Sequence, residues 1–88
     1  MTQEQRLEKL LSMENLYYSL HMRLREVETE LENIYKSIAI IEASSDYTEA
    51  TKDQMVDNVF QPEIDKRMEN ANNVQATMEN LLKDIQAI

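Results

Sequence analysis

The sequence predicts an all-α fold, an antiparallel helical hairpin of two long helices that assembles into a four-helix-type dimer. A seven-residue repeat of apolar residues runs unbroken from Leu10 to Ile41, and a second apolar series with steps of three and four follows it. The 88 residues include no glycine and one proline, so little interrupts a helix. This length fits a single domain over residues 1–88.

The first helix is expected over residues 3–43. Thr2 followed by Gln5 predicts a capping box at its start. Its apolar repeat forms a stripe, here called the seam, with two alternating positions. The first seam position holds Leu10, Tyr17, Leu24, Leu31 and Ile38, and the second holds Met13, Leu20, Val27, Ile34 and Ile41.

A turn is expected over residues 44–46, and the second helix over residues 47–87. Asp46, with Glu49 three residues later, predicts the capping box of this helix. Its apolar series consists of Met55, Val56, Val59, Phe60, Ile64, Met68, Ala71, Val74, Met78, Leu81, Ile85 and Ile88. Pro62 removes one backbone donor and crowds the preceding turn, so this helix is either kinked or broken near residues 58–61.

Folding the chain back at residues 45–46 aligns the two apolar series. Residues whose numbers add up to about 91 then face each other, and a large side chain meets a small one where Leu20 faces Ala71. The other expected pairs are Leu10–Leu81, Met13–Met78, Tyr17–Val74, Val27–Ile64 and Leu31–Phe60. Two stripes of the same period also align in other registers.

Six apolar residues near the open end of the hairpin lie outside the seam: Leu7, Leu11, Leu16, Tyr18, Met22 and Leu82. A helix that is apolar on more than one face has to be buried against something. We therefore predict that these residues form a partner or dimer interface. The alternative is a third helix, formed by a break at Pro62, that covers them within the same chain.

The chain is acidic, with a formal net charge of −8. Its middle predicts an acidic docking patch composed of Glu26, Glu28, Glu30, Glu32, Asp53 and Asp57. Such a patch is either an ordinary solvated face or a surface that docks on a basic protein. Because the basic residues are few and scattered, we expect no direct binding to nucleic acid and none to membranes.

Catalysis, cofactors and metals have no candidate residues in this sequence. Without glycine there is no phosphate-binding loop, and without cysteine there is no thiolate metal site. His21 has no acidic residue three or four positions before it, so we interpret it as a bystander. We expect no enzyme, and because no long apolar run is present we expect a cytoplasmic location.

The length and the two-helix hairpin are similar to those of two bacterial groups, the small helical-hairpin proteins of type VII secretion and the needle-subunit chaperones of type III secretion. The Trp-Xaa-Gly turn of the first group is absent, since the chain has neither residue. The likeness is one of architecture, and we assign no family. The leading hypothesis is a non-catalytic adaptor, scaffold or secretion-chaperone module that binds itself or another helical protein. The alternative is an acidic inhibitor of the phage type that blocks a basic nucleic-acid-binding site.

Overall fold

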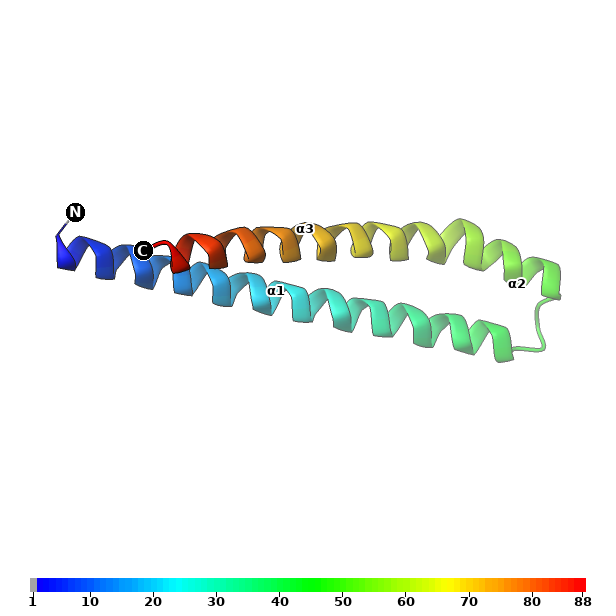
Figure 1. Cartoon of the computed structure of the whole chain (residues 1–88). Helices are drawn as coiled ribbons and strands as arrows, with labels where there is room; N and C mark the ends of the chain where they lie inside the picture. The colour runs from blue at the N-terminus through cyan, green and yellow to red at the C-terminus, as the bar shows by residue number, and fades with distance from the viewer. Residues whose placement is uncertain (1) are drawn as a thin grey trace.

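A computed structural model describes residues 2–88, which form one antiparallel hairpin of helices without strands (Figure 1). The first arm is α1, Gln3–Ala43. The second arm consists of α2, Glu49–Met55, a π-helical segment, Val56–Phe60, and α3, Gln61–Gln86. The hairpin is long and thin, with extents of 67 × 15 × 13 Å. The all-α hairpin predicted from the sequence is therefore confirmed.

The first helix has the expected bounds and the expected cap. The Thr2 hydroxyl accepts the Gln5 backbone N–H at 3.2 Å, and the Gln5 side chain accepts the Thr2 N–H at 3.0 Å. All ten seam residues are shielded from solvent, and Val27 is completely buried. Of the other residues in α1, only Glu30 is comparably shielded. The heptad repeat thus identified the buried stripe of α1.

The turn is longer than expected and the second arm begins later. Residues 44–48 connect the arms, so the second arm starts at Glu49 instead of residue 47, and it ends at Gln86. Its cap is Thr48, whose hydroxyl accepts the Thr51 N–H at 3.2 Å, so the predicted Asp46 cap is wrong. Asp46 instead donates its backbone N–H to the Ser44 hydroxyl within the turn, which keeps it outside the helix.

The second arm is kinked but unbroken at Pro62. Proline cannot donate to the residue four positions back, and its ring crowds that carbonyl. The π-helical segment resolves the conflict with one extra residue in the turn, and Gln61 donates its N–H to Val56, five positions back. The three-helix alternative, which required a break here, is not what forms.

The shielded residues of α3 follow a stricter heptad repeat than the one expected. From Phe60, just before α3, to Ile88, just after it, they are Phe60, Ile64, Arg67, Ala71, Val74, Met78, Leu81, Ile85 and Ile88; Asn70 is also shielded and lies outside this repeat. Arg67 takes the seam position between Ile64 and Ala71, and the expected Met68 is exposed. Val59 is also exposed, because the π-helical segment rotates the residues before Phe60 relative to α3.

The register differs from the expected one. Glu30, expected to face Gln61, binds Arg67, and Leu10, expected to face Leu81, lines a groove with Ile88. A second groove between the arms shows the same displacement, since it is lined by Tyr17, Leu24, Gln75, Met78, Glu79 and Leu82. The C-terminus stops short of the first turns of α1, and α2 extends past the end of α1 (Figure 1).

The arms are therefore displaced by one heptad, or about 10 Å at 1.5 Å per residue. The longer turn and the extra residue of the π-helical segment both displace α3 relative to α1 in the observed direction. A slip of one heptad keeps every seam residue in the seam, so the repeat alone does not distinguish the two registers. In a register where residue numbers add up to about 98, as for Leu10 and Ile88, the expected facing pairs are Leu10–Ile88, Tyr17–Leu81, Leu20–Met78, Leu24–Val74, Val27–Ala71, Leu31–Arg67 and Ile34–Ile64.

Candidate interaction surface

The six residues predicted to form a partner interface are all exposed. Their exposed fractions run from 39% at Met22 to 65% at Tyr18, and the other four are Leu7, Leu11, Leu16 and Leu82. The seam uses only one stripe of each helix, so neither arm covers them. These six side chains lie toward the open end, and five more large apolar residues are exposed elsewhere on the hairpin: Tyr35, Ile40, Tyr47, Val59 and Met68.

The open end is also where α1 is unpaired. The first turns of α1 project beyond the C-terminus (Figure 1). Arg6 donates to the carbonyl of Ile88 and so fastens the last residue of the second arm to α1. Leu7, Leu10 and Ile88 line a shallow groove at this junction. The open end therefore presents apolar side chains together with a free stretch of helix.

The hairpin has two flanks, one on each side of its seam. In an antiparallel pair of helices, the residue just before each first seam position lies on one flank, and the residue just after each second seam position lies on the other. In the second arm the first seam positions are Ile64, Ala71, Met78 and Ile85, and the second are Phe60, Arg67, Val74 and Leu81. We name the former flank the polar flank, and its members are Lys9, Leu16, Arg23, Glu30, Ser37, Glu63, Asn70, Thr77 and Asp84. We name the latter the apolar flank, and its members are Glu14, His21, Glu28, Tyr35, Glu42, Gln61, Met68, Gln75 and Leu82, with Leu7 one heptad before Glu14.

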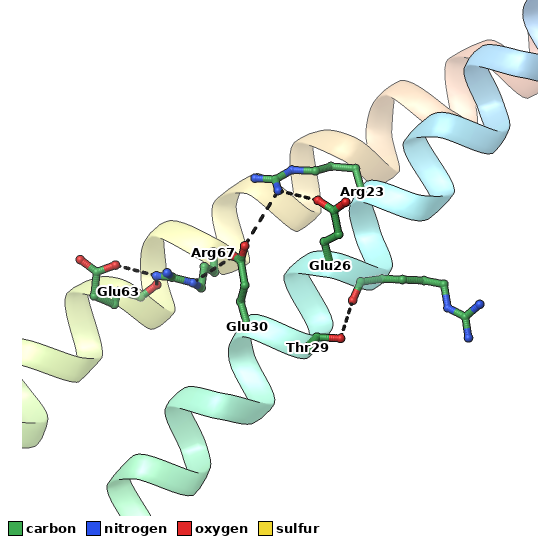
Figure 2. A network of polar contacts seen from close by, with 7 residues as sticks. Arg23, Glu26, Thr29, Glu30, Glu63 and Arg67 are labelled. Carbon is green, nitrogen blue, oxygen red and sulfur yellow. Dashed lines mark hydrogen bonds and ion pairs between the residues drawn. The ribbon is translucent and has the colours of Figure 1, made fainter.

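A network of ion pairs joins the arms along the polar flank (Figure 2). Arg67 donates from Nε to Glu30 at 3.2 Å and from Nη1 to Glu63 at 2.6 Å. Arg23 lies 3.1 Å from Glu26 and 4.0 Å from Glu30. Arg67 occupies a seam position, and its guanidinium group extends outward to Glu30 and Glu63. These two carboxylates neutralise the positive charge of Arg67.

The network shifts the pKa values of Glu63 and Arg67. The hydrogen bond from Arg67, followed by its positive charge, holds the pKa of the Glu63 carboxyl below its ordinary value of 4.5. The same hydrogen bond is the main cause that raises the pKa of Arg67 above its ordinary value, and the charge of Glu30 adds to it. Both groups stay charged at neutral pH.

The predicted acidic patch is divided by this network. Glu26 and Glu30 are paired with arginines of the same chain. Glu28, Glu32, Asp53 and Asp57 are exposed and form none of the ion pairs found among residues 2–88. Four of the six predicted patch residues therefore remain outside the ion pairs found among residues 2–88.

Two basic residues at buried positions were missed by the sequence analysis. Lys52 is buried near the turn and donates from Nζ to the carbonyl of Glu42 at 2.9 Å and to Glu49 at 3.2 Å. It thereby satisfies a backbone acceptor in the last turn of α1, where a cation also interacts favourably with the helix dipole. Arg67 is the second of these basic residues. In the sequence, only its heptad spacing from Ile64 and Ala71 indicates that it occupies a seam position.

Residues 2–88 hold no group of three or more histidine, cysteine or acidic side chains that could bind a metal ion. Within the same residues, no helix is both long and apolar enough to cross a membrane. His21 lies exposed on the apolar flank. Comparison of the chain with family models, curated proteins and solved structures finds no match. The hairpin and its exposed apolar end are therefore the features on which a functional argument can be based.

Proposed function

We propose that the chain is a non-catalytic helical interaction module, of the adaptor, scaffold or secretion-chaperone kind, that binds protein through its open end. The observation that supports this is the exposure of Leu7, Leu11, Tyr18, Met22 and Leu82 on a hairpin whose own seam is complete without them. Apolar side chains spaced along one helix are what a partner helix packs against. Burial of each is worth about 1.5–3 kcal/mol, so three together contribute about 4.5–9 kcal/mol, against about 8 kcal/mol for micromolar binding.

The test combines a charged triple variant with cross-linking in cells. A lysine-reactive reagent should join the tagged chain to its partner through Lys9 and Lys83, which lie toward the open end, in preference to Lys36 and Lys66. The variant Leu11→Glu, Tyr18→Glu, Met22→Glu should lose these cross-links and weaken binding of the purified partner at least 100-fold.

A matched control changes the same kind of residue at the closed end. Tyr35, Ile40 and Tyr47 are large, apolar and exposed, and each lies away from the open end. Replacing all three with glutamate should leave partner binding within a factor of about three. Equal loss in both triple variants, or cross-links concentrated at Lys36 and Lys66, would contradict a binding surface at the open end.

A second candidate function depends on the free acids. Glu28, Glu32, Asp53 and Asp57 make no ion pair among residues 2–88 and carry much of the net charge of −8. An acidic inhibitor that covers a basic nucleic-acid-binding site would use them. Its binding would weaken steeply between 50 and 300 mM salt, where the Debye length falls about 2.4-fold, and would be lost in Glu28→Lys, Glu32→Lys, whereas apolar packing would be nearly unchanged.

A further inference from the structure

We infer that the occupant of the open end is a second copy of this chain, with the first halves of the two α1 helices packed antiparallel against each other. The inference rests on the proposed function and names its partner. The contact uses a stripe on the outside of α1, here called the outer stripe, that consists of Leu7, Leu11, Tyr18 and Met22. At about 100° per residue, these side chains fall within an arc of about 60° whose centre lies about 130° from the seam. The second arm therefore does not cover them.

One two-fold axis pairs the outer stripe with itself. The axis passes beside the midpoint of the stripe at right angles to α1, so each α1 lies along the partner's α1 and the hairpins point in opposite directions. Leu7 and Met22 are equally far from this midpoint, so Leu7 packs against the partner's Met22. Leu11 and Tyr18 are also equally far from it, so Leu11 packs against the partner's Tyr18. All four side chains are exposed in the single chain, at fractions between 39% and 65%.

The charges at the ends of the outer stripe fit the same axis. Glu4 lies three residues before Leu7, and Arg25 lies three residues after Met22, so the axis places Glu4 opposite the partner's Arg25. Both side chains are exposed, and neither forms an ion pair among residues 2–88. A parallel pair of helices would instead place Glu4 beside the partner's Glu4. Charge complementarity therefore favours the antiparallel arrangement.

The structure leaves room for the partner along this contact. A shallow hollow on the outside of α1 lies where the partner's Leu7 and the partner's Glu4 arrive. It is lined by Met22, Arg25, Glu26, Thr29 and Glu30. At the other end of the contact, the first turns of α1 project beyond the C-terminus and have no second arm beside them (Figure 1). A partner helix packed there shields turns that the chain itself leaves unpaired.

The exposed area of the single chain fits a partner of this size. The hairpin exposes 6719 Å². A compact monomer of 10.4 kDa exposes about 5,400 Å², so the chain carries an excess of roughly 1,300 Å². A standard interface removes about 800 Å² from each partner, which this excess can supply.

The first experiment is sedimentation equilibrium of the purified full chain, in which the wild type should be a dimer at tens of micromolar. Tyr18→Glu should raise the dissociation constant about 100-fold. The matched control is Leu16→Glu, which should change it less than about threefold. Leu16 is half exposed but lies about 150° around α1 from the centre of the outer stripe.

Circular dichroism should show both variants helical. If Tyr18→Glu fails to fold, Tyr18→Gln should still raise the dissociation constant more than about tenfold. A larger effect of Leu16→Glu than of the Tyr18 substitution would overturn the assignment to the outer stripe.

The second experiment exchanges the charges at the ends of the stripe. Arg25→Glu should raise the dissociation constant about tenfold, since it places two carboxylates together at each end of the contact. Adding Glu4→Arg to Arg25→Glu should restore the dissociation constant to within about threefold of the wild type. Glu4→Arg on its own opposes the helix dipole, so recovery in the double variant has to come from the contact between copies. Failure of the exchange to restore association would overturn the axis.

The charge at the axis provides a further check. The two copies of Glu14 approach each other there, because Glu14 lies beside the midpoint of the outer stripe. Glu14→Gln removes this repulsion and should lower the dissociation constant about twofold. Weaker association of this variant would contradict an axis at this point.

The third experiment tests the orientation with cysteines, which the chain lacks. A mixture of Leu11→Cys chains and Tyr18→Cys chains should yield a disulfide-linked dimer under mild oxidation. Each variant alone should not, because its two cysteines stand about 10 Å apart along the axis of α1. Covalent dimers of Leu11→Cys alone would indicate a parallel pair and overturn the arrangement. Small-angle X-ray scattering should give a longest dimension of about 95 Å, whereas a parallel pair would stay near the 67 Å of one hairpin.

A wild type that remains monomeric at hundreds of micromolar would also overturn the second copy as the occupant. The proposed function would survive that result if the open-end triple variant still loses an identified helical partner. If neither self-association nor partner binding depends on the open end, both the inference and the proposed function fail.

Discussion

The two flanks of the hairpin run along the same seam but differ in what their side chains contact. On the polar flank, Arg67 binds Glu30 and Glu63, so the charges there are satisfied inside the chain. On the apolar flank, Met68 and Leu82 have no such partner and remain in water. The two flanks differ because heptad repeats assign residues to the seam and leave the flanks free to vary. One flank joins the arms, and the other leaves large apolar side chains exposed.

The largest expected effect comes from breaking the seam that both flanks share. Val27 is completely buried midway along α1. Val27→Asp would place an unpaired charge there and should destabilise the hairpin by about 4 kcal/mol or more, enough to unfold most of it. Thermal unfolding followed by circular dichroism measures the loss.

Two substitutions calibrate that result. Val27→Ala removes two buried methyl groups and should cost about 2 kcal/mol, without introducing charge. Tyr35→Asp, at an exposed position of the apolar flank, should change stability by less than about 0.5 kcal/mol. If Val27→Asp were as stable as Val27→Ala, the seam would not be buried as the structure has it.

Much of this fold could be predicted from the sequence because its signals are local. The Thr2 capping box, the bounds of α1 and its ten seam residues depend on spacing within one helix, and all agree with the structure. The effect of Pro62 also has a local cause, and the continuous alternative is the one that forms. Local patterns of this kind need no knowledge of what lies across the hairpin.

The register and the flanks could not be predicted in the same way, because they depend on contacts between arms. Two equal heptad repeats fit in registers seven residues apart, and a turn two residues longer than expected favours the second. Arg67 was missed because a charged residue at a seam position is identified only by its partners, Glu30 and Glu63.

The polar flank can be broken at its centre to learn whether it selects the register. Arg67→Met would complete an apolar seam and remove the contact to Glu30. A polar residue at a seam position often specifies alignment at some cost in stability, so we expect the variant to unfold no more easily than the wild type but to populate both registers.

Cysteine pairs measure the register directly. Leu20→Cys with Met78→Cys should form an intramolecular disulfide in the wild-type background, and Leu20→Cys with Ala71→Cys, about 10 Å away along the axis, should not. In the Arg67→Met background both pairs should link. Efficient linking of Leu20 to position 71 with Arg67 intact would show that the observed register is not the one in solution.

The smallest effect is the pH dependence of the same network. The pKa of Glu63 is lowered in the folded chain, so its carboxylate contributes stability that is fully present above its ordinary pKa of 4.5. That contribution is lost as the pH falls through the lowered value, since a protonated Glu63 no longer attracts Arg67. Urea unfolding of wild type and Glu63→Gln at fixed protein concentration, between pH 7 and pH 3, measures it.

The wild type should be the more stable of the two at pH 7, and the difference should shrink as the pH falls below 4.5 and through the lowered pKa of Glu63. Glu69→Gln, which removes a carboxylate outside the ion pairs, controls for the general effect of charge. A Glu63→Gln difference that does not change with pH would mean that the side chain acts through its packing or its helix propensity. In that case the ion pair would help to align the arms without adding to the free energy of unfolding. The polar flank would then differ from the apolar flank only in its effect on the register.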